Sequence, residues 1–105
     1  MYTSFESFKQ EFLTFADTYL SMWSRDYGLP KPPVYIIPDD MMDPWECSAV
    51  YLTKGRKHSG VVGPAIIFRE GYLRDMFENA YSKNKMSTLW RVLWWILAHE
   101  FGHYY

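Results

Sequence analysis

The chain ends with two histidines four positions apart and a glutamate beside the first, in the segment "AHEFGHYY". On an α-helix, residues four apart differ by about 40° in direction and by one turn in height, so His99 and His103 can converge on one metal ion. Glu100 lies about 100° around the helix from His99, where its carboxylate can hydrogen-bond a water molecule on the metal. The pattern predicts a zinc site with a general base.

A zinc ion with three protein ligands keeps its fourth position for water and lowers the pKa of that water toward about 7. Glu100 would take the proton and later deliver it to a leaving amine, while zinc polarises the scissile carbonyl. Gly102, without a side chain, would let a neighbouring strand or a substrate backbone approach the helix. The alternative is that His99 and His103 face the C-terminal dipole of the helix and bind no metal.

The N-terminal part of the chain must form an element that covers this helix. Apolar residues recur every three or four positions over residues 3–27 and predict one apolar stripe along a helix: Phe5, Phe8, Phe12, Phe15, Ala16, Tyr19 and Trp23. Thr3 and Glu6 have the spacing of a capping box, and Gly28 followed by Pro30 predicts the end of the helix.

The middle of the chain predicts a small sheet. "VYIIP" (34–38) is rich in β-branched and aromatic residues, and "CSAVYLT" (47–53) and "VVGPAIIF" (61–68) are two further strand candidates. A glycine-containing basic turn joins the last two, which favours a hairpin, with Pro64 at an edge or a bulge.

Two helices are expected to follow. "GYLRDMFENAYSKNK" (71–85) has apolar residues at helical spacing, and Ser87 or Thr88 can cap a final helix that runs to about Tyr104. That final helix is apolar on nearly every side, so we expect it to be buried, either within its own domain or against something that this chain does not contain.

The motif His99-Glu100-Phe101-Gly102-His103 resembles the His-Glu-x-x-His of zincin-type metallopeptidases, and the order of elements is similar to the N-terminal half of a minimal zincin. The resemblance implies an α+β fold and a peptide or protein substrate. It also implies that His99 and His103 bind zinc, that Glu100 is the general base, and that a strand above the helix binds an extended substrate. "GPAIIF" (63–68) is the candidate for that strand, and a plain core strand is the equal alternative.

Most zincins place a third zinc ligand downstream, where this sequence has only Tyr104 and Tyr105. The ligand could come from a longer protein of which residues 1–105 are a truncated single domain, or from a second copy across a dimer interface. It could also lie upstream, at Cys47 or His58, or at Glu78 if its helix folds back. A Cys47 ligand would be similar to the arrangement in peptide deformylases, and would imply a deformylase-like amidase.

Composition limits the classes of partner. A formal net charge of -1 over 105 residues gives no electrostatic reason for nucleic acid or an anionic membrane as the main partner. The basic turn "TKGRKHSG" (53–60), which includes His58, is expected to be solvated, as are the acidic residues Asp39, Asp40, Asp43, Glu70 and Glu78.

Cellular location is constrained by cysteine usage and hydropathy. The single cysteine, Cys47, cannot form an internal disulfide, and the first residues lack the pattern of a secretory signal, which together predict an intracellular, cytoplasmic protein. The apolar run "LWRVLWWILA" (89–98) contains Arg91 and is too short to span a bilayer.

From the sequence, we therefore expect a zinc-dependent metallopeptidase that hydrolyses peptide bonds. The alternative is a catalytically silent zincin-fold binding module, or an incomplete part of a metallopeptidase, that forms a homodimer through its tryptophan-rich final helix.

Overall fold

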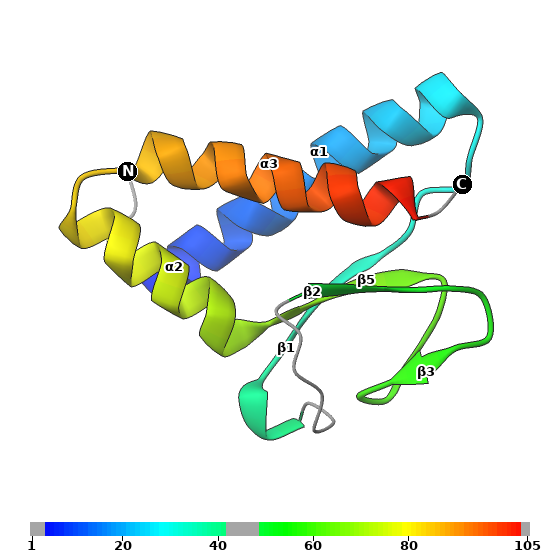
Figure 1. The fold of residues 1–105 in the computed structure, drawn as a ribbon, viewed down its shortest axis with the longest axis horizontal. Coiled ribbons are helices and arrows are strands. Elements are labelled where there is room, and N and C mark those ends of the chain that lie inside the picture. Colours follow the sequence, from blue (N-terminus) through cyan, green and yellow to red (C-terminus); the bar gives the residue numbers. More distant parts are fainter. Residues whose placement is uncertain (1–3, 42–48, 104–105) are drawn as a thin grey trace.

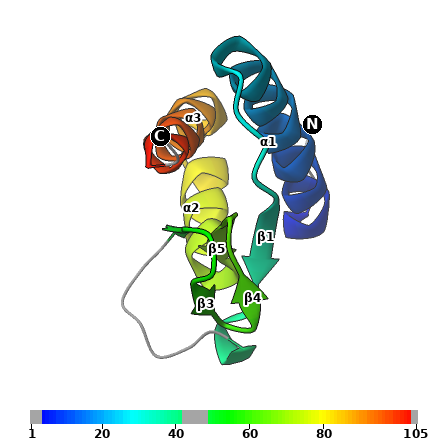
Figure 2. The same ribbon diagram turned by 90° about the vertical axis from the view of Figure 1, so that its right-hand side faces the viewer.

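The structure is a computed structural model that describes residues 4–41 and 49–103. It is a mixture of helices and strands, in agreement with the predicted α+β class. Figures 1 and 2 show the helices on one side of the molecule and the strands on the other. In chain order the elements are α1 (Phe5–Tyr27), β1 (Val34–Ile37), the 3-10 turn η1 (Asp39–Met41), β2 (Ala49–Leu52), β3 (Lys57–His58), β4 (Val61–Val62), β5 (Ala65–Arg69), α2 (Glu70–Ser82) and α3 (Met86–Gly102).

Helix α1 forms because its apolar residues share one face, as predicted. Phe8, Phe12 and Ala16 of that stripe have no exposed surface, and Leu20 extends the buried face by another turn. The helix begins one residue later than a Thr3 cap would place it, because the Ser4 hydroxyl accepts a hydrogen bond from the Ser7 amide at 3.2 Å. Thr3 itself lies outside the described residues.

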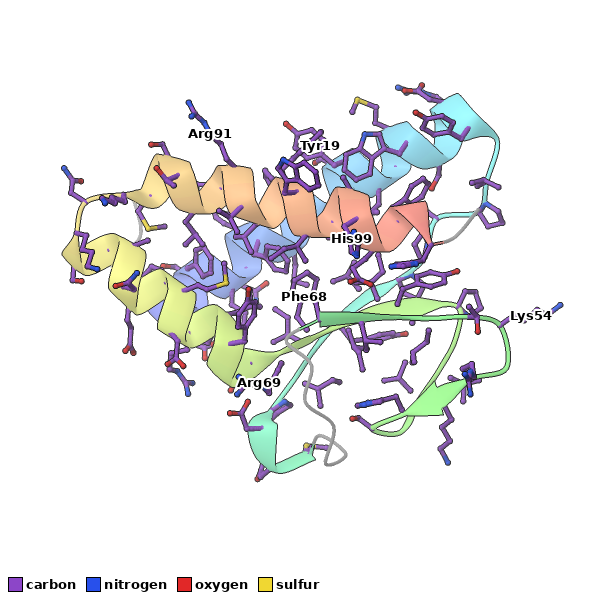
Figure 3. The ribbon with its side chains drawn as sticks, viewed as in Figure 1. Tyr19, Lys54, Phe68, Arg69, Arg91 and His99 are labelled. Carbon is purple, nitrogen blue, oxygen red and sulfur yellow. The ribbon has the colours of Figure 1, made fainter. Side chains whose placement is uncertain are left out.

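The main sheet has the order β1-β5-β2, with β1 parallel and β2 antiparallel to β5. Residues 65–68 of β5 are completely buried. Phe68 lies between the sheet and the helices (Figure 3), with its ring 5.0 Å from that of Phe12 in an edge-on contact. The core between helices and sheet consists mainly of Phe8, Phe12, Ala16, Leu20, Ile66, Phe68, Leu73, Phe77, Leu89, Leu93, Leu97 and Phe101.

The predicted hairpin between residues 47–53 and 61–68 is more elaborate than expected. Strands β2 and β5 do pair, but residues 61–62 form a separate two-stranded sheet with residues 57–58. Ser59 and Gly60 both have positive φ angles, 52° and 81°, which allow the tight turn between β3 and β4.

The strand "GPAIIF" cannot bind a substrate strand, because β5 is central and pairs on both of its edges. It is therefore a core strand, which was the alternative. Among the described residues, the open edges of the main sheet belong to β1 and β2. Strand β2 packs against α3.

Helix α2 begins with a cap that the sequence did not predict. Its N-cap residue, Arg69, makes no side-chain cap. Instead the Asp39 carboxylate accepts hydrogen bonds from the Gly71 amide at 2.8 Å and from the Arg69 guanidinium at 3.0 Å. The expectation that Asp39 is merely solvated was therefore incomplete, because a residue distant in the sequence caps the helix.

Glu70 was also expected to be solvated, and that expectation is wrong. Its carboxylate accepts a hydrogen bond from the Lys9 ammonium at 2.9 Å, and both side chains are about one-fifth exposed. The hydrogen bond to Glu70 raises the pKa of Lys9. This ion pair joins the second turn of α1 to the first turn of α2.

Helix α3 differs from its prediction in two respects. Ser87 and Thr88 do not cap it, since both lie inside the helix and Lys85 is the N-cap without a side-chain cap. The helix is also only partly buried within its own domain, so its predicted burial against something that this chain does not contain stays a prediction. One stripe faces the core, whereas Trp95 is 68% exposed and Trp94 38%. Within the part of the chain that the structure describes, no helix combines the length and apolar character needed to cross a membrane.

The capping role of Asp39 can be tested by replacement with alanine. Asp39→Ala should lower the free energy of unfolding by about 1 kcal/mol, because the Gly71 amide at the start of α2 loses its acceptor. Urea denaturation followed by circular dichroism measures this change. Asp40→Ala, in the same 3-10 turn, is the matched control and should change stability by less; equal losses in both variants would refute the cap.

Candidate metal centre

His99 lies in the last turn of α3, on the part of the helix above the strands (Figure 3), and His103 is the C-cap residue that follows the helix. Both are exposed. Their Nε2 atoms are 3.3 Å apart. The two rings are nearly perpendicular, with centroids 4.9 Å apart. The predicted convergence of the two imidazoles is therefore present in the folded chain.

The distance between the two nitrogens fits a shared zinc ion. Two nitrogens that each lie about 2.1 Å from one ion, at a tetrahedral angle, are about 3.4 Å apart. The Nε2–Nε2 distance of 3.3 Å agrees with this value without any side-chain movement. The two imidazoles thus have the spacing of a pair of metal ligands.

Glu100 completes the group and is buried, whereas the two histidines are exposed. Its residue is only 8% exposed, because it lies on the side of α3 that packs toward the sheet. One ligand-type atom from each of His99, Glu100 and His103 lies within 4.8 Å of the others, so together they could hold a metal ion.

The backbone amide of Tyr51, in the edge strand β2, donates a hydrogen bond to the Glu100 carboxylate. This bond fixes the carboxylate between α3 and β2. Side-chain patterns did not identify Tyr51 as part of the site, because the group involved is a backbone amide that every residue except proline has. The packing of α3 against β2 brings this amide to the Glu100 carboxylate.

The pKa of Glu100 is raised above its ordinary value, chiefly because burial removes water from the charged carboxylate. His103, His99 and the Tyr51 amide act in the opposite direction, since each favours the ionised form. Glu100 is therefore a partly buried carboxyl group with a stronger affinity for protons than a surface glutamate, a property of a general base.

The two other described candidate ligands, His58 and Glu78, do not join this group. Cys47 lies outside the described residues. His58 belongs to β3, and its expected solvation is wrong: it is 2% exposed and its Nδ1 lies 2.7 Å from the Ser59 hydroxyl. Glu78 is exposed on α2, as expected. Among the described histidine, cysteine and carboxylate side chains, those of His99, Glu100 and His103 form the group that could hold a metal ion.

Gly102 does not serve close approach of a neighbouring strand, and the predicted approach of a substrate backbone stays a prediction. A Cβ atom at this position would meet no described atom within 4 Å, so no neighbouring strand packs against it. The side of α3 around Gly102 is open, and the strand that approaches the helix does so on the Glu100 side.

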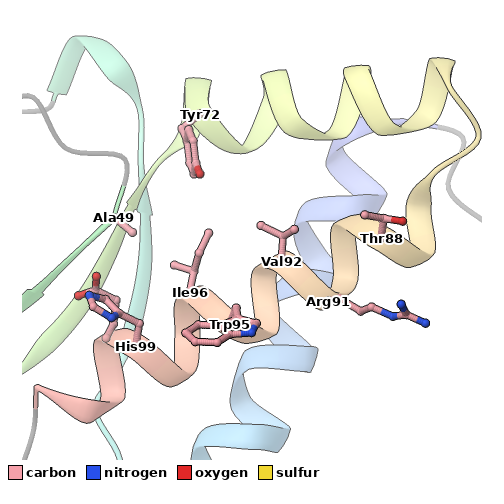
Figure 4. A pocket seen from close by; sticks show the side chains of 9 residues that line it. Ala49, Tyr72, Thr88, Arg91, Val92, Trp95, Ile96 and His99 are labelled. Atoms are coloured by element: carbon pink, nitrogen blue, oxygen red, sulfur yellow. The ribbon is translucent and has the colours of Figure 1, made fainter.

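A cavity of about 610 Å³ opens directly beside the site. Ala49, His99 and Glu100 form one end, while Thr88 and Arg91 form the other (Figure 4). Its walls between the two ends are mostly apolar, from Val92, Trp95 and Ile96 of α3 and from Tyr72 of α2. The volume is in the range of small-molecule and peptide side-chain pockets.

The burial of Glu100 makes the stability of the metal-free chain depend on pH. Because the folded state binds the Glu100 proton more tightly than the unfolded state does, the folded chain loses stability as pH rises through the ordinary glutamate range toward the raised pKa. Glu100→Gln removes this charge. It should raise the melting temperature at pH 7 but not at about pH 3, where the native carboxyl is already neutral.

Differential scanning calorimetry with a chelator present measures this difference. Glu78→Gln, on the exposed face of α2, is the matched control and should show a smaller change at pH 7. A Glu100→Gln variant that melts at or below the native temperature at pH 7 would contradict the cost of burying the carboxylate.

Comparisons of the chain with protein-family models, with curated proteins and with solved structures returned no match in any of the three. The assignment of a function therefore depends on the chemistry of the site itself.

Proposed function

We propose that this chain is a zinc-dependent peptidase of minimal zincin type, in which His99 and His103 hold the metal and Glu100 is the general base. The observation that carries the proposal is the 3.3 Å separation of the two Nε2 atoms beside a buried carboxylate of raised pKa. Metal-assisted hydrolysis of an amide requires side chains that bind the metal and, beside them, a group that accepts a proton from water. The two imidazoles and the Glu100 carboxylate are groups of these two kinds.

When bound, zinc would supply Lewis acidity toward the scissile carbonyl and a position at which water ionises near neutral pH. The residues of the chain perform the proton transfers. Glu100 accepts a proton from the attacking water as its oxygen bonds to the carbonyl carbon. It then donates that proton to the amide nitrogen as the C–N bond breaks, so the products are a carboxylic acid and an amine.

The edge of β2 is where we propose that an extended substrate binds. Edge strands carry backbone groups that the sheet does not use, and a peptide can pair with those of β2 other than the Tyr51 amide, which already donates to Glu100. Ala49 of β2 also lines the cavity beside the site, which would bring the paired peptide next to Glu100. This assignment moves the substrate strand of the zincin resemblance from residues 63–68 to the β2 edge.

The third zinc ligand stays a prediction. Cys47, a second copy of the chain, or residues of a longer protein could each supply it. The described group contains one further metal-binding side chain, that of Glu100, which the proposal assigns to proton transfer. The zinc content of a Cys47→Ser variant tests whether Cys47 is the third ligand. Loss of zinc in this variant would favour the deformylase-like amidase. The intracellular location expected from the single cysteine also stays a prediction.

The peptidase mechanism is tested by separating metal binding from proton transfer. Glu100→Gln should retain the zinc content of the native chain and lose roughly 10²–10⁴-fold in cleavage rate, because the amide cannot accept the proton. His103→Ala should lose both zinc and cleavage. Zinc per chain by mass spectrometry and cleavage of casein, an unstructured protein, measure the two properties.

Glu78→Gln is again the matched control and should keep zinc and cleavage. A Glu100→Gln variant that cleaves casein at the native rate would rule out the role of Glu100.

A second candidate function is supported by the exposed aromatic surface of α3. Trp94, Trp95 and Val92 are between 38% and 68% exposed, and large exposed apolar surfaces often mark sites of association. In this alternative the chain is a catalytically silent binding module that forms a homodimer through α3.

Light scattering over a range of concentrations tests the dimer. A native dimer should become monomeric in Trp95→Ser, because the substitution removes the most exposed tryptophan of α3. Tyr35→Ser, which alters an exposed aromatic residue of β1, is the control and should leave the mass unchanged. A native chain that is monomeric at all concentrations would exclude this function.

A further inference from the structure

The cavity beside the candidate metal centre is a groove with two chemically different ends. His99 and Glu100 lie at one end, and Arg91 and Thr88 lie at the other. Figure 4 shows Thr88, Arg91 and His99 in sequence along α3, with Tyr72 from α2 pointing toward the helix and the Arg91 side chain extending outward at the far end. The groove therefore runs along the axis of α3, away from the site of the proposed reaction.

Its length matches a short extended peptide. Arg91 and His99 are eight residues apart, which on a helix is about 12 Å. An extended peptide advances about 3.4 Å per residue, so three or four substrate residues would span this distance. The walls of Val92, Trp95 and Ile96 are apolar, which favours large apolar side chains in this stretch.

The charge at the far end is positive and unbalanced within the described structure. Arg91 is the one lysine or arginine of α3, a helix that the structure describes throughout. It forms no ion pair with any described residue. Its guanidinium can hold a carboxylate through two parallel hydrogen bonds, and the Thr88 hydroxyl one turn earlier adds a further donor.

We propose that Arg91 determines substrate specificity, and that the groove selects peptides in which an apolar stretch of three or four residues ends in a carboxylate. The carboxylate would be either an acidic side chain or a free C-terminus, since the chemistry at Arg91 is the same for both. This inference rests on the proposed function, because it assigns the groove to the substrate of that site.

Peptide binding to the metal-free chain tests the proposal without any need for catalysis. Three peptides are titrated by NMR: acetyl-Phe-Leu-Leu-Glu-amide, its Gln counterpart, and acetyl-Phe-Leu-Leu-Ala with a free carboxylate. The Glu peptide should bind roughly threefold to fivefold more tightly than the Gln peptide, as expected for a partly exposed ion pair. The third peptide shows whether a C-terminal carboxylate binds as well as a side chain.

Substitutions then assign the preference to Arg91. Arg91→Ala should bind the Glu and Gln peptides equally, and Arg91→Glu should instead prefer a peptide that ends in lysine. Lys54→Ala, which removes the same charge from a turn far from the groove (Figure 3), is the matched control and should keep the native preference.

Equal binding of the Glu and Gln peptides to the native chain would overturn the inference, as would an unchanged preference in Arg91→Ala. Occupation of the groove by a second copy, seen as native dimers that Trp95→Ser dissociates, would also overturn it. None of these results depends on zinc or on cleavage, so failure of the specificity can be distinguished from failure of the peptidase.

Discussion

The packing of α3 against the edge strand β2 is the contact on which the candidate site depends. It buries Glu100 and brings the amide of Tyr51 to the carboxylate, while the neighbouring His99 and His103 stay exposed. A helix alone would place all three side chains in water. The strand surrounds Glu100 with protein while its neighbours lie in water, and this difference in solvation is what would distinguish the proposed proton acceptor from the proposed metal ligands.

That contact is maintained by a core built from all three helices. Phe68 of the central strand packs against Phe12 of α1, and the buried stripe of α3 covers the same region. The Lys9–Glu70 pair and the Asp39 cap then fix where α2 begins relative to α1 and the sheet. Because α2 and α3 are joined by only a few residues, the start of α2 also constrains the path of α3.

The surface of α3 serves more than the core. Since leucines occupy its buried stripe, its tryptophans, valine and arginine face outward or line cavities, where they could contact a ligand or a partner. Large exposed apolar surfaces often mark sites of association. The groove, the open edge of β2 and Glu100 are adjacent, so one bound peptide could contact all three.

The sequence by itself determined the types and approximate limits of the helices, the three strands of the main sheet, and the convergence of His99 and His103. These features follow from local periodicity and from helix geometry, which neighbouring residues control. It did not determine that β5 is central, that residues 57–62 form their own sheet, or that His58 is buried. Strand order and burial depend on which distant segments pair, and no local pattern specifies that.

The same limit applies within the site. The motif named Glu100 as a base, but the raised pKa comes from burial against β2, and the hydrogen bond comes from a backbone amide about fifty residues away in the chain. Asp39 became a helix cap because the fold brought it to Gly71. Residue types thus supplied the chemical groups, and only the tertiary structure decided which of them lie in water and which lie against one another, because solvation and distance are properties of the packed chain.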